Sequence, residues 1–324
     1  MNFSLIFYLF YHCVLSSNLL NIRILTMNRP KSLKKLLNSI ESIDFQNYQI
    51  NLEFFVDVDS KFNRVDNETL ELIKSFSWDY GNKTFVVNKK SIGLKGQWFR
   101  PYYYDAPFVI LEDDIELCNN FFEIAKKSLV HIKSIGRNDI FGISFQKLRL
   151  ILKDDNCPNF KPNLFLSNNV EKNSTFFLSQ MSTWAPIVFG DKWNELLKFY
   201  EYSKKSKFNH CIPGSIANLW YETSGTFMQF FLYAKNYFLM YFYLDEPIIV
   251  NNFEKGLHFK KKTNFEKCWS STSELSIMFN SKIFFDQGFN IFNFSKITNI
   301  NSILRNMDNK TQCNYKPNKQ KCKL

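Results

Sequence analysis

The sequence predicts an α/β fold with a mostly parallel central sheet, and three observations support this class. A helical pattern over 33–40 lies between strand-like runs at 21–26 and 51–58, and a strand–helix–strand unit of this length pairs its strands in parallel. Further strand-like runs follow at 83–88 and 108–111. The last run is entirely apolar, as expected of a strand that is covered on both faces.

The first half of the chain reads as alternating strands and helices. Asn28-Arg29-Pro30 interrupts the first strand, and Leu33, Leu36, Leu37 and Ile40 then recur at helical spacing. The remaining predictions for this half are an amphipathic helix at 69–76, a glycine-containing turn at 91–96, a helix at 97–104 and a helix at 120–132 with Asn120 as its cap.

The second half is less regular, with strands predicted at 141–145, 187–189 and 238–244 and helices at 192–200 and 227–234. The apolar stretch 227–244 is interpreted as buried core. It contains Lys235, and a charge at the centre of a bilayer costs about 2.5–3.5 kcal/mol. No repeat and no Pro/Gly/Ser-rich linker is visible, so one domain is the simplest interpretation of the 324 residues.

The net charge of +11 is spread along the chain. Its densest basic runs are 260–262 and the tail that contains Lys316, Lys319, Lys321 and Lys323. Binding of nucleic acid usually requires Lys and Arg gathered on one face. We therefore expect no nucleic-acid partner and attribute most of the excess charge to a solvated surface.

Residues 1–18 are predicted to be a signal peptide or a short membrane anchor. Leu5 to Leu15 is an apolar run of signal-peptide length, and Ser16-Ser17 follows it. The run is shorter than the roughly 20 residues that a transmembrane helix needs. The sequence therefore predicts the secretory pathway, in the ER or Golgi lumen, with membrane association through the N-terminus as one outcome and secretion as the other.

The cysteines agree with that compartment. Without Cys13, six remain, and an even number fits disulfide formation in an oxidising environment. Free buried thiols in a reducing compartment are the alternative. The sequence does not choose among the possible pairings.

Three carboxylates, Glu112-Asp113-Asp114, directly follow the apolar run 108–111. In an open α/β sheet, ligands bind outside the carboxyl ends of the strands. Adjacent carboxylates repel each other, which raises their pKa values unless a cation compensates. Mg²⁺ or Mn²⁺ fits this role, because such hard ions take oxygen ligands and keep positions open for substrate phosphates. An acidic loop without a ligand is the alternative.

The run 108–116 (FVILEDDIE) resembles the acidic, DXD-like metal-binding motif of glycosyltransferases with the GT-A fold. Its Glu-Asp-Asp form is similar to that of the N-acetylglucosaminyltransferases that initiate complex N-glycan branches. Four further segments resemble the same family in the same order, namely 26–30 (TMNRP), Asp57 with Asp59, 91–96 with Arg100, and 256–258 after Asn252 and Glu254. The resemblance covers roughly residues 20–262.

This resemblance implies a GT-A type three-layer α/β/α sandwich with a mostly parallel central sheet over residues 19–265. Residues 266–324 would then form a C-terminal extension that is partly flexible. The implied activity is metal-dependent transfer of a sugar, with inversion, from a nucleotide diphosphate donor to a hydroxyl of a glycan or glycoprotein. The favoured donor is a UDP-sugar, and the favoured metal is Mn²⁺ or Mg²⁺.

The chemistry of the side chains at these positions predicts roles for single residues. Asp114 would be the direct metal ligand with Asp113 beside it, and His258 would meet the metal or the diphosphate. Arg29 and Lys95 would pair with phosphate oxygens. The residues expected to bind the donor are Thr26, Arg29, Asp57, Lys95, Glu112 and Asp113, with Glu112 turned toward the ribose. Trp184 is a candidate for stacking on an acceptor sugar.

The general base is where this sequence departs from the family. Many inverting members carry a paired acid before a helix in the second half, whereas 220–225 (WYETSG) offers only Glu222. Asp191 is the other candidate. The departure leaves open a catalytically inactive GT-A protein that binds glycans or nucleotides. A nucleotidyltransferase of the same fold is disfavoured, because 26–30 contains no glycine.

Overall fold

The computed structural model describes residues 19–103, 106–148, 162–206, 212, 215, 217, 223–251, 277–280 and 282–286. Its strands are β1 (Asn21–Thr26), β2 (Leu52–Val56), β3 (Lys83–Val87), β4 (Phe108–Glu112), β5 (Ile115–Leu117), β6 (Ile140–Ile143), β7 (Ser174–Leu178), β8 (Ile187–Val188), β9 (Phe238–Tyr243), β10 (Ile249–Asn251) and β11 (Phe284–Phe285). Its helices are α2 (Pro30–Glu41), α3 (Asn67–Ser75), α4 (Gly93–Trp98), α5 (Phe121–Ile135), α6 (Pro162–Asn169), α7 (Gly190–Ser206) and α8 (Ser224–Lys235).

The predicted α/β class with a mostly parallel central sheet is confirmed. β1 pairs in parallel with both β2 and β4, and β2 pairs in parallel with β3. The pairs β6–β9 and β7–β11 are also parallel, whereas β4–β8 and β7–β9 are antiparallel. The chain clusters into two compact units, which are described in turn.

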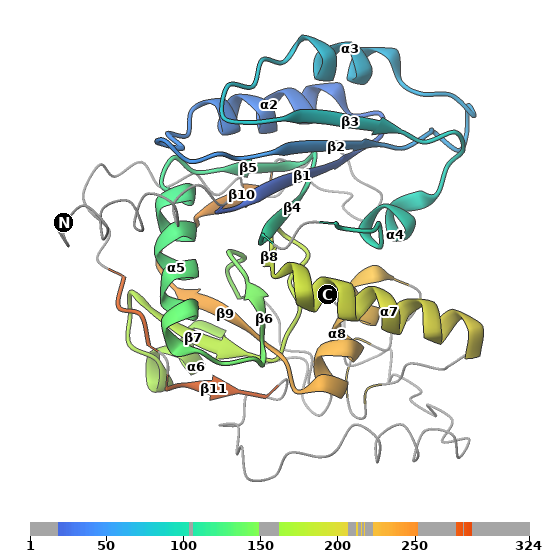
Figure 1. The fold of residues 1–324 in the computed structure, drawn as a ribbon. Coiled ribbons are helices and arrows are strands. Elements are labelled where there is room, and N and C mark those ends of the chain that lie inside the picture. Colours follow the sequence, from blue (N-terminus) through green and yellow to red (C-terminus); the bar gives the residue numbers. More distant parts are fainter. Residues whose placement is uncertain are drawn as a thin grey trace, which may run out of the picture. The chain divides into compact units, whose positions relative to one another are not determined.

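The first unit contains the strands in the order β8-β4-β1-β2-β3. The chain builds β1, β2 and β3 outward on one side and then crosses over to β4 on the other side of β1. All six residues of β1 are buried. Helices α2 and α3 lie together beside the strands (Figure 1). The short antiparallel pair β5–β10 belongs to the same unit.

The sequence of α2 explains its position. Pro30 occupies the first turn, where its fixed φ suits a helix and its missing N–H costs nothing. The buried residues of the helix recur at helical spacing and are Ser32, Leu33, Leu36, Leu37 and Ile40. These apolar side chains form one stripe, and burying that stripe is what stabilises a helix of this length.

The second unit contains the order β11-β7-β9-β6, together with α6, α8 and most of α7. Thr223 caps the start of α8 by accepting from Thr226 N at 3.2 Å. Asn236 ends it in the left-handed conformation that asparagine tolerates. The prediction of buried core for 227–244 is confirmed, because α8 and β9 are almost wholly buried. In the described part of the chain, no helix is long and apolar enough to cross a membrane.

One helix prediction was wrong in position. The helix expected at 97–104 is α4, which begins at Gly93 and ends at Trp98. Gly93 has φ +68, which glycine adopts without strain, and this conformation lets the helix start inside the predicted turn. Pro101 disfavours a helical conformation at the residue before it, so the helix ends early.

Five elements were not predicted: β5, β7, β10, β11 and α6. The four strands are two to five residues long. Such short runs carry too little periodicity to be recognised. Each of these strands pairs with a segment distant in sequence, and β5 and β10 pair with each other, so only the tertiary structure identifies them.

Candidate active site

Polar residues gather where four neighbouring strands of the first unit end. Thr26 ends β1 and Glu112 ends β4, while Asp57 and Asn88 directly follow β2 and β3. The four strands are parallel and adjacent, so these ends share one edge. The chain order reverses between β1 and β4, and such a switch point is where open α/β sheets bind ligands.

The acidic triplet lies at this switch point. Thr26 Oγ1 donates to Asp113 Oδ2 at 2.7 Å. The guanidinium of Arg29 donates to Asp114 Oδ2 at 2.8 Å and forms an ion pair with Asp113 Oδ1. Asp113 is 1% exposed and Asp114 is 8% exposed. The structure therefore brings Thr26 and Arg29 from one end of β1 into direct contact with the two aspartates after β4.

Burial and mutual repulsion change the acidity of this triplet. Burial, reinforced by the charge of Asp114, raises the pKa of Glu112 from 4.5 to about 7, although the hydrogen bond from Trp98 lowers it. Burial also raises the pKa of Asp113 to about 6, although Arg29 and Thr26 oppose the rise. Burial lowers the pKa of Arg29, but the charges of Asp113 and Asp114 outweigh that effect and raise it overall.

Asp57 holds the start of α4. It is 3% exposed. Its carboxylate accepts from Asn88 Nδ2 at 2.7 Å, from Ile92 N at 3.1 Å and from Gly93 N at 2.9 Å. A carboxylate at a helix N-terminus satisfies amide groups that have no partner within the helix. The groups that donate to the Asp57 carboxylate are thus protein groups, and Asp57 affects this edge by fixing the position of α4.

The far end of α4 holds Glu112. Trp98 Nε1 donates to Glu112 Oε1 at 3.0 Å. Trp98 itself is fully buried. Because one end of α4 is fixed by Asp57 and the other contacts Glu112, this short helix connects the polar edge of β2 with that of β4.

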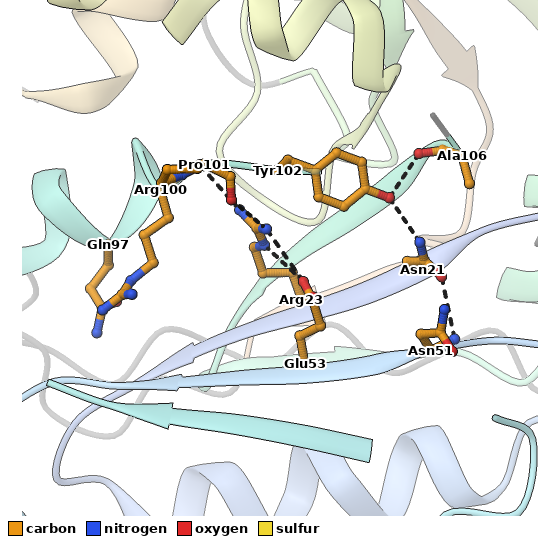
Figure 2. A network of polar contacts seen from close by, with 9 residues as sticks. All are labelled: Asn21, Arg23, Asn51, Glu53, Gln97, Arg100, Pro101, Tyr102 and Ala106. Carbon is orange, nitrogen blue, oxygen red and sulfur yellow. Dashed lines mark hydrogen bonds and ion pairs between the residues drawn. The ribbon is translucent and has the colours of Figure 1, made fainter. Parts of the chain in front are cut away.

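A buried arginine of β1 anchors the segment that follows α4 (Figure 2). Arg23 forms an ion pair with Glu53 at 3.3 Å and donates to the carbonyl oxygens of Arg100 at 3.3 Å and Pro101 at 3.0 Å. Tyr102 Oη donates to Ala106 O at 2.8 Å, as Figure 2 also shows. These contacts satisfy backbone acceptors that the irregular segment cannot pair within itself.

The other predicted residues lie in α4, shortly before β8, in α7 or outside the described residues. Lys95 lies in α4 and is half-buried. Asp191 is exposed in the first turn of α7, and Trp184 is half-buried in a bend. Glu222 and His258 lie outside the described residues, as do Asn252, Glu254 and residues 1–18.

The sequence analysis missed three residues of the site, namely Asn28, Asn88 and Trp98. Asn28 Nδ2 donates to Asp59 Oδ2 at 2.6 Å. A signal existed for Asn88, because it is the last residue of the strand predicted at 83–88. No pattern in the sequence indicates that Trp98 reaches Glu112.

The donor set at the triplet fits a divalent ion. Among the described residues, no three His, Cys, Asp or Glu side chains are grouped closely enough to hold a metal. Mg²⁺ and Mn²⁺ sites of nucleotide enzymes commonly use one or two carboxylates, with substrate phosphates completing the shell. Asp113 and Asp114 supply two such carboxylates at the switch point.

Cys118 follows β5, close in sequence to the triplet, and is disulfide-bonded. Its backbone N–H donates to Ile248 O at 3.0 Å, beside the pairing of β5 with β10. The other six cysteines all lie outside the described residues. The chain therefore contains at least one disulfide.

Neither a protein-family model nor a curated protein sequence matches this chain. Similar solved structures include S. aureus TarS 1-349, at 13% identity and a TM-score of 0.40, covering 71% of this chain and 59% of that one. TarS 1-349 in complex with UDP-GlcNAc is 14% identical, has a TM-score of 0.43, and the match covers 74% of this chain and 60% of that one. The mannosyltransferase PcManGT from Pyrobaculum calidifontis in complex with GDP-Man and Mn²⁺ is 11% identical and has a TM-score of 0.36. That match covers 60% of this chain and 53% of the other.

This chain thus spans only 59% and 60% of the two TarS chains that it matches.

Proposed function

We propose that this protein is a glycosyltransferase that moves a sugar from a nucleotide diphosphate donor to a hydroxyl of a glycan or glycoprotein. The observation that carries the proposal is the cluster of Thr26, Arg29, Asp113 and Asp114 at the switch point between β1 and β4. A UDP-sugar is the favoured donor, and inversion is the favoured outcome, both on the resemblance of the motif 108–116.

In this proposal, Asp114 and Asp113 hold the metal, and His258 is a further candidate ligand. When bound, Mn²⁺ or Mg²⁺ neutralises charge on the diphosphate leaving group. Thr26 orients the carboxylate of Asp113 through its hydroxyl. Glu112, held by Trp98, faces the donor ribose in this proposal, and Lys95 reaches the phosphates. Asp57 shapes the donor site by fixing the start of α4.

The metal is tested by calorimetry of UDP binding. We expect chelation to weaken UDP binding, and Asp114→Ala to weaken it by at least about tenfold, since even groups that only support metal ligands contribute this much. Chelation should then add little to the variant. The matched control is Asp79→Ala, which removes an exposed carboxylate of the same unit. Equal UDP affinity with and without metal would remove the metal from the proposal.

The acceptor base is proposed to be Glu222, with Asp191 as the second candidate. A general base acts in the transition state, so Glu222→Gln should lower transfer by about 10²–10⁴-fold and leave donor affinity nearly unchanged. Full transfer by this variant would make Asp191 the proposed base, and Asp191→Asn would then be tested in the same way. A wild-type protein that binds UDP but neither transfers nor hydrolyses the sugar would instead be an inactive binding module.

We further propose that the protein belongs to the secretory pathway, in the ER or Golgi lumen, membrane-anchored or secreted. The disulfide at Cys118 supports an oxidising compartment. The apolar run at 5–15 supports targeting to that pathway.

A further inference from the structure

Arg29 is the cation that balances Asp113 and Asp114 in this structure. It directly precedes Pro30, the first residue of α2, and its guanidinium reaches across to the loop after β4. The guanidinium contacts Asp113 Oδ1 and Asp114 Oδ2, while the second oxygen of Asp113 accepts from Thr26. One guanidinium thus donates a charge-assisted hydrogen bond to Asp114 and forms an ion pair with Asp113.

The oxygens that Arg29 contacts are the ones that a divalent ion needs. A metal ion and a guanidinium carry the same sign of charge, so they repel each other at these carboxylates and compete for the same oxygens. The side chain of Arg29 is 31% exposed, whereas those of Asp113 and Asp114 are 1% and 11% exposed. Arg29 is therefore the partner with room to move.

A displaced Arg29 has a second anion within its reach if the site takes a nucleoside diphosphate. Phosphate oxygens accept from arginine in the same forked geometry as carboxylates do. The residue begins the turn into α2 at the carboxyl end of β1, next to the switch point.

We propose that Arg29 and the divalent ion exclude each other at Asp113 and Asp114, and that the arriving ion releases Arg29 to bind the diphosphate of the donor. The second part of this proposal rests on the proposed function. The exchange makes the affinities for ion and donor interdependent, because the ion removes the carboxylates that otherwise hold Arg29 away from phosphate.

The first test measures Mn²⁺ affinity by calorimetry without nucleotide. Arg29→Gln keeps a polar side chain but loses the charge, so we expect it to bind Mn²⁺ at least about tenfold more tightly than the wild type, or about 1.4 kcal/mol. The matched control is Lys34→Gln, which removes one exposed positive charge from α2. Its Mn²⁺ affinity should equal that of the wild type.

The second test measures UDP affinity at saturating Mn²⁺. Arg29→Gln should bind UDP at least about tenfold more weakly, although it binds the ion more tightly, and a change in opposite directions is not expected of general structural damage. Arg29→Lys keeps the charge but loses the forked guanidinium, so its UDP affinity should lie between those of the wild type and Arg29→Gln. It also serves if Arg29→Gln does not fold.

The outcomes separate this inference from the proposed function. Unchanged or weaker Mn²⁺ binding by Arg29→Gln overturns the competition, even if the wild type transfers sugar. Unchanged UDP affinity at saturating Mn²⁺ overturns the release to the diphosphate. Tighter Mn²⁺ binding by the variant of a protein that binds no UDP-sugar supports the competition and contradicts the glycosyltransferase function.

Discussion

The surroundings of Glu112 strongly alter its protonation. Burial and the charge of Asp114 raise its pKa from 4.5 to about 7. The folded protein therefore holds this proton more tightly than the unfolded chain does. Between pH 4.5 and about 7, the folded state binds more protons, so its free energy of unfolding falls as the pH rises.

We expect Glu112→Gln to remove this part of the pH dependence. In the presence of a chelator, the variant should match the wild type at pH 4.5 and should be more stable above pH 7, by on the order of 2 kcal/mol. Gln keeps an oxygen that can accept from Trp98 Nε1, so the comparison isolates the charge. Denaturant unfolding across this pH range is the measurement. Parallel pH profiles for the two proteins would contradict the assignment.

The element that organises the site is α4, a helix of only six residues. An isolated helix of this length is not stable in water. Its position depends on three contacts from outside it, namely Asp57 at its start, Glu112 near its end, and Arg23 on the carbonyl oxygens that follow. A change at any of these contacts should therefore reach the triplet through the helix.

Asp57→Asn tests this dependence. Asn offers one neutral acceptor oxygen where Asp57 offers two charged ones to Ile92 N and Gly93 N, so we expect a loss of about 1–3 kcal/mol in unfolding free energy. Donor binding should weaken with it, and turnover at saturation should change less.

The control for this test is Asp66→Ala, which removes the cap of α3. It should cost about 1 kcal/mol of stability and leave donor affinity unchanged. If both variants weaken UDP binding equally, the effect comes from general destabilisation and not from α4.

At the scale of the whole molecule, the feature that bears on the compartment is Cys118, which is disulfide-bonded. Peptide mapping of protein from its own cells should find the peptide of Cys118 joined to a second cysteine peptide under non-reducing conditions. The same experiment should find cleavage near Ser16–Asn18 or membrane retention. Protein with all thiols free and an intact, soluble N-terminus would contradict the secretory proposal.

Much of the first unit was predictable because its information is local. The strand β1 has the predicted bounds, and β2, β3 and β4 lie within one or two residues of theirs, since each is a short apolar run next to a break. The position of the triplet at the carboxyl edge followed from the buried strand before it. Asp57, which the resemblance singled out, lies at the same edge because it directly follows β2.

What the sequence by itself determined is the α/β class and which side chains follow the strands, because periodicity and strand ends are properties of neighbouring residues. The tertiary structure decided which partners those side chains have. Arg29 is predicted to pair with phosphate, and the structure adds that its guanidinium lies on Asp113 and Asp114. Trp98 was predicted only as part of a helix, and its indole reaches Glu112. Such pairings join residues 14 to 87 positions apart, and the chain fixes them only when the sheet brings its strand ends together.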